Sequence, residues 1–530
     1  MHSLLCKSGK TRVIALSAAT LAVLAFSAGA LAAGTTQSGE QKNMKRVGHV
    51  DLQGRSSYQP NVIVYPDGRT IAFAGTHNGT KPNPLKFGSP VEQNGTMIID
   101  VTNPKNPIEK FHIPGTGGDS QMVRMCLGKD LPRGITGKVY LLRNFNTGYE
   151  TWDVTDVSAP VKLATLPNIR STHKLWWECN TGIAYLPGSK NAAPLWRSDQ
   201  SMIIVDWKDP ANPPIYLRTH GLPGGQPSGT GPVPPSLHGA ISTHDHPNAA
   251  GKLARGATAD DIIGNRVYSA WGVGDNGVLQ VLDRKKLLPF PYGAFSGNPD
   301  DPTNAELESA QTSILYMSPD QGGHTSMPVF GLMPSSYQNF TEFKTRDIVL
   351  LASEATSNRC QEAPHWSFIV DVTVENSKNA SAGPPPLNAQ QNPWQGPMVL
   401  STMSVDPRTG EKYPRGNYCT RGARFGVHSS EENFRNPYYG RCTVLAYFTG
   451  GVRAWDIREP QEPVEVGFYV AEANANTVAT GYMTNNTEVD NRGYIYTTDR
   501  GGSGFDIIKL IGKARNICRK PDVDDDGDDD

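Results

Sequence analysis

The sequence has no excess of charge of either sign, since 50 Lys and Arg stand against 51 Asp and Glu in 530 residues. A net charge of −1 gives no indication of a nucleic-acid partner. Long amphipathic helical patterns are absent, which argues against an α/β fold. The chain also has no Gly-x-Ser-x-Gly elbow, no phosphate-binding loop and no pair of carboxylates at a defined spacing, so hydrolases and nucleotide-binding enzymes have little support.

Apolar runs long enough to cross a bilayer are lacking outside the N-terminal region. There, basic residues at positions 7, 10 and 12 precede an apolar run that ends at the small-residue sequence Ala30-Leu31-Ala32. This pattern predicts a cleaved signal peptide over 1–32, followed by a polar linker over 33–43. We therefore expect a periplasmic or secreted protein, with no membrane span in the mature chain.

What the sequence does contain is a repeated phrase: a short apolar strand that ends in Asp, followed by a turn with Asn-Pro or Asp-Pro and a second Pro. Successive copies of the closing Asp are 53, 53, 77, 88, 85 and 50 residues apart, so the unit has about 50 residues and the middle units carry insertions. The fourth and seventh copies lack the Pro turn. The closing residues are Asp100, Asp153, Asp206, Asp283, Asp371, Asp456 and Asp506.

Each unit has the pattern of four short strands joined by tight turns. Units of this length with four antiparallel strands are typical of propeller blades, so the copies predict an all-β, seven-bladed β-propeller over 44–518. The last unit lacks a fourth strand, and the isolated strand over 47–52 has the right character to supply it. An N-terminal strand paired there closes the ring and removes an exposed sheet edge. An open two-domain β protein is the alternative.

The C-terminal residues 519–530 are predicted to form an acidic disordered tail. Their aspartates copy the first half of an EF-hand loop, so a bound Ca²⁺ is the alternative. No Glu stands at the twelfth position of that loop, which favours the solvated tail.

Six of the seven cysteines remain after the predicted cleavage, and they form no C-x-x-C motif. In an exported chain this favours disulfides over a zinc ribbon or a thioredoxin-like motif. We pair Cys126 with Cys179, because both occupy late first-strand positions in neighbouring blades. Cys360 and Cys419 are both expected on one face of the ring, which leaves Cys442 with Cys518.

The repeated phrase, apolar-apolar-Val/Ile-Asp-Val/Ile-x-Asp/Asn-Pro-x-x-Pro, resembles that of the LVIVD-repeat β-propeller proteins. The resemblance covers most of the mature chain, from about Met44 to Leu510. It implies the blade architecture and says little about function, because that family is mostly a structural grouping.

Histidine recurs at one position of the unit, just before the first strand, and first strands line the central channel of a propeller. Four consecutive units carry it, and His238 lies near one of these positions. Imidazoles that converge on one axis are good ligands for a divalent transition metal. The alternative is that each His only hydrogen-bonds at a blade junction. The predicted metal ligands are His173, His244, His324 and His428.

Further polar residues are expected on the same face, in the loops between second and third strands. We predict Arg143 and Arg500 as anchors for an anionic substrate, and Glu354 as a residue that orients a ligand histidine from behind. These three complete the predicted catalytic site. The alternative is that each is an ordinary exposed loop residue.

The four-histidine layout is loosely similar to that of carotenoid-cleavage-type dioxygenases, which hold a non-haem iron on the propeller axis. It is also loosely similar to selenium-binding/methanethiol-oxidase propellers, which hold copper. The local motifs do not match, so the resemblance implies a metal-dependent oxidoreductase, with Fe²⁺ or Cu favoured over Zn or Mn, and no particular small-molecule substrate. Two alternatives stay open: a polysaccharide lyase that acts on a glycan, and a non-catalytic propeller that binds a cell-surface or periplasmic partner.

Overall fold

The computed structural model describes residues 40–248, 263–339, 344–373, 375, 397–478 and 481–519. Their regular structure is almost all β-strand, and no helix among them is long and apolar enough to cross a membrane. The predicted signal peptide and almost all of the acidic tail lie outside the described residues. The described helices are α1 (Arg284–Leu287), α2 (Asn304–Glu308) and α3 (Gly512–Cys518), with 3-10 turns η1 (Leu52–Gly54), η2 (Ile263–Asn265), η3 (Ser335–Tyr337), η5 (Pro407–Lys412) and η6 (Tyr418–Thr420).

Five antiparallel sheets each contain four strands in chain order. The first two are β3 (Ser57–Val64), β4 (Thr70–Thr76), β7 (Thr96–Asp100), β8 (Ile108–Ile113), and β9 (Val123–Leu127), β10 (Val139–Phe145), β11 (Gly148–Asp153), β12 (Val161–Pro167). The third is β14 (Trp176–Trp177), β15 (Ile183–Lys190), β16 (Ser201–Asp206) and β17 (Ile215–His220), to which β13 (Ile169–Arg170) adds a short fifth strand. The next two are β18 (Leu237–Ser242), β19 (Arg266–Trp271), β20 (Val278–Asp283), β21 (Gln311–Tyr316), and β22 (Thr325–Leu332), β23 (Arg346–Ala352), β24 (Ser367–Asp371), β25 (Met398–Met403).

A nine-stranded sheet contains the rest of the ring. One part is β26 (Phe425–Ser430), β27 (Cys442–Phe448), β28 (Val452–Asp456) and β29 (Val464–Tyr469), extended by β1 (Gln41–Lys42). The other part is β30 (Thr484–Val489), β31 (Tyr494–Asp499), β32 (Phe505–Leu510) and β2 (Met44–Val50). A single residue pair, Phe448 with Thr484, joins the two parts.

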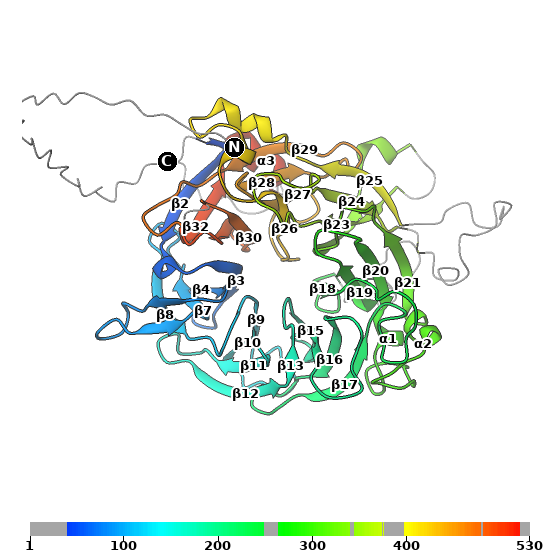
Figure 1. Ribbon diagram of the computed structural model, residues 1–530. Helices are drawn as coiled ribbons and strands as arrows, with labels where there is room; N and C mark the ends of the chain where they lie inside the picture. The colour runs from blue at the N-terminus through cyan, green and yellow to red at the C-terminus, as the bar shows by residue number, and fades with distance from the viewer. Residues whose placement is uncertain are drawn as a thin grey trace, which may run out of the picture. The chain divides into compact units, whose positions relative to one another are not determined.

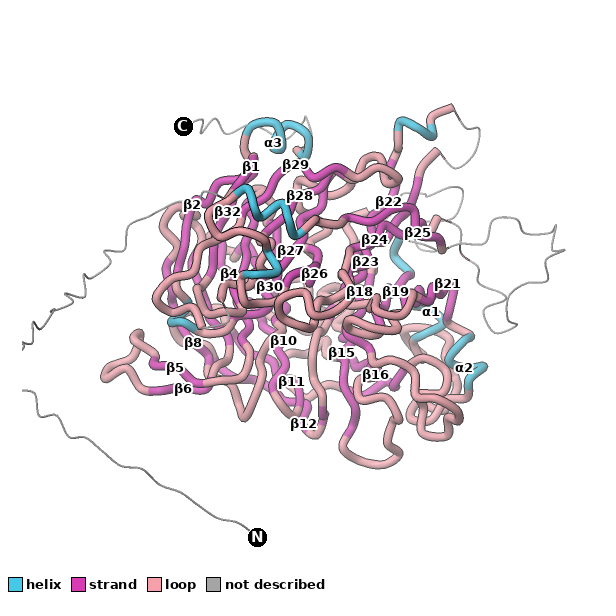
Figure 2. The backbone as a smooth tube through the Cα atoms, turned by 45° about the horizontal axis from the view of Figure 1, so that its top comes forward, coloured by secondary structure: helices cyan, strands magenta, loops and turns pink. Residues whose placement is uncertain are grey.

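The sheets stand around a central axis, as Figure 1 shows, and together they form a β-propeller of four-stranded antiparallel blades. The first strands, such as β3, β9, β18 and β30, lie nearest the axis, and β8, β12, β17 and β21 lie at the rim (Figure 1). A separate hairpin, β5 (Thr80–Pro82) and β6 (Val91–Gln93), projects from the ring (Figure 2).

In six copies the repeated Asp ends the third strand of a sheet, whereas Asp506, predicted to close the seventh, is the second residue of β32 (Phe505–Leu510). In five copies the Asp side chain accepts a hydrogen bond from the backbone N–H two residues later, at 2.8–3.1 Å, which is an Asx turn. The fourth and seventh copies behave differently. Asp283 accepts from the backbone N–H of Lys286 and caps α1, and Asp506 bonds to His49 instead.

The hydrophobic residues of the repeated phrase are buried between neighbouring sheets. Phe73 of β4 and Ile98 of β7 lie in one cluster with Leu141 of β10, and none of the three is exposed to solvent. Burial of a large apolar side chain contributes about 1.5–3 kcal/mol, so these interfaces hold adjacent blades together.

The N-terminal strand closes the ring, as predicted. β2 pairs antiparallel with β32, so that Met44 faces Leu510 and Val50 faces Phe505. Regular structure begins earlier than the predicted linker boundary, because β1 pairs with β29 in the other part of the nine-stranded sheet. The N-terminal segment therefore pairs with both parts of that sheet.

All three predicted disulfides are present. Cys126–Cys179 joins the second and third sheets, and Cys442–Cys518 ties α3 to β27. Cys360–Cys419 links the loop after β23 to η6. Disulfides of this kind are characteristic of exported proteins.

Candidate metal centre in the central channel

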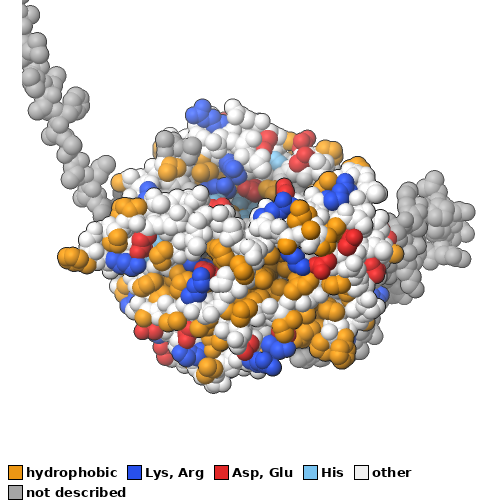
Figure 3. All heavy atoms as spheres, turned by 60° about the horizontal axis from the view of Figure 1, so that its bottom comes forward, with side chains coloured by type: hydrophobic (Ala, Val, Ile, Leu, Met, Phe, Trp, Pro, Cys, Tyr) orange, Lys and Arg blue, Asp and Glu red, His pale blue; other side chains and the backbone are white. Residues whose placement is uncertain are grey.

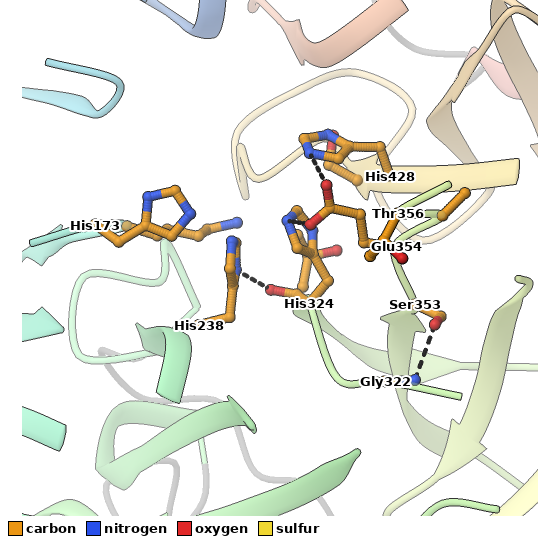
Figure 4. Close-up of polar contacts among 12 residues, drawn as sticks. His173, His238, Gly322, His324, Ser353, Glu354, Thr356 and His428 are labelled. Atoms are coloured by element: carbon orange, nitrogen blue, oxygen red, sulfur yellow. Dashed lines mark hydrogen bonds and ion pairs between the residues drawn. The ribbon is translucent and has the colours of Figure 1, made fainter. Parts of the chain in front are cut away.

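Four imidazoles from four consecutive sheets meet near the axis (Figure 4). His238 and His428 lie on the first strands β18 and β26, His324 lies directly before β22, and His173 lies three residues before β14. The ring centroids are 4.5 Å apart for His173 and His238, 3.5 Å for His238 and His324, and 4.4 Å for His324 and His428. The four rings therefore form a continuous row, each in contact with the next.

Two further side chains complete this group. The hydroxyl of Tyr58, from β3, lies 3.5, 3.4 and 3.3 Å from Nε2 of His173, His238 and His324. Glu354 follows β23, and its carboxylate oxygens lie 3.2 Å from Nε2 of His324 and 3.6 Å from Nε2 of His428. We call these six residues the channel cluster.

Hydrogen bonds on the outer side of the rings determine their tautomers. Nδ1 of His238 lies 2.5 Å from the carbonyl oxygen of His324, and Nδ1 of His428 lies 2.6 Å from that of Asn485. A carbonyl oxygen only accepts, so each Nδ1 carries the hydrogen and each Nε2 presents a lone pair to the centre. A backbone carbonyl behind the ring is the usual support of a metal-bound histidine.

The centre has more acceptors than donors. Tyr58 can donate one hydrogen, although three Nε2 atoms surround its hydroxyl. Nε2 of His428 has no hydrogen-bond partner among the described residues, and the nearby carboxylate of Glu354 can only accept when ionised. The ligand atoms of His324, Glu354 and His428 lie within 4.8 Å of one another. A cation at this point satisfies these lone pairs.

The electrostatics favour neutral imidazoles beside an ionised carboxylate. Burial lowers the pKa of His173 to about 3 and the pKa values of His238 and His428 well below the ordinary value. Burial also acts to raise the pKa of Glu354, but His324, His428 and Arg500 outweigh it and lower that pKa well below its ordinary value. These are the protonation states in which the groups can bind a metal.

Two arginines lie beside Glu354. Arg424, one residue before β26, donates to the Glu354 carboxylate at 2.8 Å, and Arg500, directly after β31, lies 3.7 Å from the same oxygen. A space-filling view shows a hollow in the middle of one face, with histidine, basic and acidic side chains around it (Figure 3).

The structure brings together five of the seven predicted site residues, namely His173, His324, His428, Glu354 and Arg500. Glu354 is closer than predicted, because its oxygens face Nε2 of the histidines rather than the backs of the rings. His238 and Tyr58 complete the cluster without having been predicted as ligands. The Leu-His pair at the start of β18 is a sequence signal for His238, whereas Tyr58 is distinguished only by its place in β3.

The placement of His244 in the centre is wrong. β18 begins at Leu237, directly after a Pro- and Gly-rich stretch, so His238 occupies the channel position and His244 follows the end of the strand. Nδ1 of His244 lies 2.8 Å from the carbonyl oxygen of Gly264. The Thr-His pairs at 172–173 and 243–244 look alike in the sequence but lie at opposite ends of their first strands.

The placement of Arg143 is also wrong. β10 runs on to Phe145, so Arg143 lies inside a strand and is fully buried. Its guanidinium pairs with Glu150 at 2.7 Å and donates to the carbonyl oxygens of Ile113 and Pro114 in the preceding blade. Arg143 therefore joins two blades and lies outside the channel cluster.

Comparisons with known proteins bear on the fold alone. No protein-family model matches the sequence, and no curated protein matches it. The chain is similar to the structure of U3-55K, with 10% identity, a TM-score of 0.42, and coverage of 88% of this chain and 98% of that chain. It is also similar to the C-terminal WD40 domain of Sif2 (8% identity, TM-score 0.41, coverage 90% and 100%) and to the Dos1 propeller (10%, 0.41, 88% and 96%).

Proposed function

We propose that the channel cluster binds one divalent transition metal ion, and that this protein is an exported, metal-dependent oxidoreductase that acts on a small organic substrate. The observation that carries the proposal is that the ligand atoms of His324, Glu354 and His428 lie within 4.8 Å of one another. Nε2 of His238 faces the same place, 3.4 Å from the Tyr58 hydroxyl that also approaches His324. Imidazole and carboxylate ligands without a thiolate suit Fe²⁺ or Cu, which we favour over Zn or Mn. The three disulfides support export.

The chain's own residues have distinct roles in this proposal. His238, His324, His428 and Glu354 hold the ion, which when bound supplies Lewis-acid and redox chemistry. The Tyr58 hydroxyl points at the same place, and burial raises its pKa well above the ordinary value, so it stays protonated and acts there as a hydrogen-bond donor. Arg424 fixes the orientation of the Glu354 carboxylate.

We also propose that the ring has seven blades, with the nine-stranded sheet counted as two. The support is that Phe448 and Thr484 form the only backbone pair between β27 and β30 among the described residues, whereas β26–β29 and β30–β32 with β2 each repeat the four-strand pattern. Six of the seven repeated Asp residues end the third strand of their unit, which agrees with this count for the first six units.

The test is a redox titration of the purified protein after loading with Fe²⁺ or Cu, followed by electron paramagnetic resonance. We expect a signal from one bound ion that changes reversibly with dithionite and oxygen. His238→Ala should abolish the signal, and His244→Ala should keep it, because His244 lies outside the cluster. A protein that holds only a redox-inactive ion, or no ion, contradicts the proposal.

The second candidate is a non-catalytic binding propeller. It is favoured by the projecting β5–β6 hairpin, on which Leu85, Phe87 and Val91 expose apolar side chains to solvent. Exposed apolar groups of this kind occur at binding sites. This candidate predicts that Phe87→Ser abolishes partner binding, whereas His238→Ala leaves it unchanged. A polysaccharide lyase would instead release unsaturated products from uronate polymers without any metal.

A further inference from the structure

The guanidinium of Arg500 is unusual among the charged groups of the channel, because the described residues offer it no hydrogen-bond partner. Its nearest carboxylate oxygen belongs to Glu354 and lies 3.7 Å away, beyond hydrogen-bond distance. The carboxylate of the neighbouring Asp499 accepts from the backbone N–H groups of Met483 and Ser503 and forms no ion pair with Arg500 among the described residues. The N–H donors of the Arg500 guanidinium are therefore free, and the side chain is partly exposed.

Arg424 lies beside Arg500, and only some of the N–H donors of its guanidinium have a hydrogen-bond partner. One of its nitrogens, Nη1, donates to Glu354 and to the carbonyl oxygen of Ala355, and its other nitrogens donate to no described residue. Nη1 of Arg424 and Nη1 of Arg500 lie 2.8 and 3.7 Å from the same oxygen of Glu354, so the two guanidinium groups are close together.

The acidic groups nearby leave an excess of positive charge. Glu354 is shared among two arginines and two imidazoles. Glu362 is engaged elsewhere, since it accepts from Thr356 and Ser357 at 2.6–2.8 Å. His77 stands close by, with its ring 5.0 Å from Tyr58, and its Nε2 has no partner among the described residues. The site thus combines free donors with an uncompensated charge.

We propose that Arg424 and Arg500 form an anion subsite beside the channel cluster, and that the substrate is a small organic acid whose carboxylate binds there. The planar fork of a guanidinium matches the two oxygens of a carboxylate, and such pairs are among the strongest hydrogen bonds in proteins. A carboxylate at this point holds the remainder of a small molecule next to Glu354 and Tyr58. The claim that the bound acid is a substrate, and not only a ligand, rests on the proposed function.

The test is calorimetric titration of the full chain with benzoate, carried out on both metal-loaded and metal-free protein. We expect Arg500→Gln to weaken benzoate binding about tenfold or more, since a charge-assisted pair is lost. Arg408→Gln should leave binding unchanged, because that exposed arginine pairs with Asp406 on the outer surface. Arg500→Lys, which keeps the charge but not the fork, should restore only part of the affinity.

Titrations of metal-free and metal-loaded protein distinguish the proposed anion subsite from the proposed metal centre. Benzoate binding that depends on Arg500 in metal-free protein supports the anion subsite even where no metal binds. A protein that binds metal but shows no Arg500-dependent benzoate binding overturns the anion subsite and leaves the metal centre standing. Inorganic phosphate that binds as tightly as benzoate overturns the assignment to a carboxylate.

Discussion

The hydroxyl of Tyr58 lies 3.3 Å from Nε2 of His324, although the two residues are 266 positions apart in the chain. Tyr58 comes from β3 in the first sheet and His324 directly precedes β22 in the fifth, so their contact spans the channel. The contact forms only when the ring is complete. The channel cluster is therefore a property of the closed propeller and not of any one blade.

Replacement of Tyr58 by Phe tests the role of this hydroxyl. The ring volume stays the same, and no carbonyl loses a partner, so we expect the melting temperature to change little. The hydroxyl lies on the metal-facing side of the imidazoles, so its loss removes an oxygen that can contact the ion, and the metal affinity should fall. Competition with a chelator measures it. An affinity equal to that of the wild type would show that the hydroxyl has no part in binding.

Replacement of Arg143 by Ala should damage the fold and spare the metal centre. It leaves Glu150 buried with Lys162 as its remaining cationic partner, at 2.8 Å, and a broken buried pair costs about 3–5 kcal/mol. Urea unfolding measures the loss of stability, and metal content serves as the control. If Arg143→Ala removed the metal from folded protein, the assignment of Arg143 to a blade interface would fail.

The closure of the ring should depend on pH through His49 of β2. Burial lowers its pKa, but hydrogen bonds to Asp506 and Asp51, at 2.7 and 2.9 Å, outweigh this and raise the pKa from 6.5 to about 9. The folded-state pKa is the higher one, so this stabilisation is fully present below pH 6.5 and is lost as the pH rises to about 9.

The measurement is the melting temperature of wild type and His49→Gln across this pH range. The difference between the two proteins should be largest at the acidic end and should shrink as the pH approaches 9. A difference that is constant with pH would mean that the charge of His49 does not contribute to closure.

The Cys442–Cys518 disulfide should stabilise the C-terminal end of the ring. It closes a loop with a sequence separation of 76 residues and holds α3, whose Ala514 packs in one buried cluster with Val466 and Tyr469 of β29. We expect the double variant Cys442→Ala, Cys518→Ala to lose about 2–5 kcal/mol in the free energy of unfolding. Reduction of the wild type breaks all three disulfides and should give at least this loss, and an unchanged unfolding curve of the double variant would contradict the prediction.

Much of the fold could be predicted because the repeated Asp has a local cause. An Asx turn needs only the Asp and the two residues after it, so the pattern is visible in the sequence. The spacing of the repeated Asp then locates the strands of each unit. Six cysteines allow 15 pairings, and their expected places in the units favoured the three that the structure contains. The closing strand could be predicted because the last unit lacks a fourth strand, and the isolated strand over 47–52 can supply it.

The site was harder to predict, because it depends on where each first strand begins. A difference of six positions separates His238 from His244, and only the pairing of β18 with β19 decides between them. Arg143 and Arg500 look alike as polar residues after apolar runs. One is inside a strand that runs on to Phe145, and the other directly follows a strand that ends at Asp499. Such ends are determined by tertiary pairing, not by local sequence.

The most direct test of the metal centre is the metal content of purified wild-type protein, His238→Ala and His244→Ala, measured by elemental analysis after dialysis against a weak chelator. The wild type and His244→Ala should each retain one Fe or Cu ion per chain, and His238→Ala should retain almost none while its melting temperature stays close to that of the wild type. Equal metal content in the two variants, or none in the wild type after reconstitution, would contradict the presence of a metal centre in the channel.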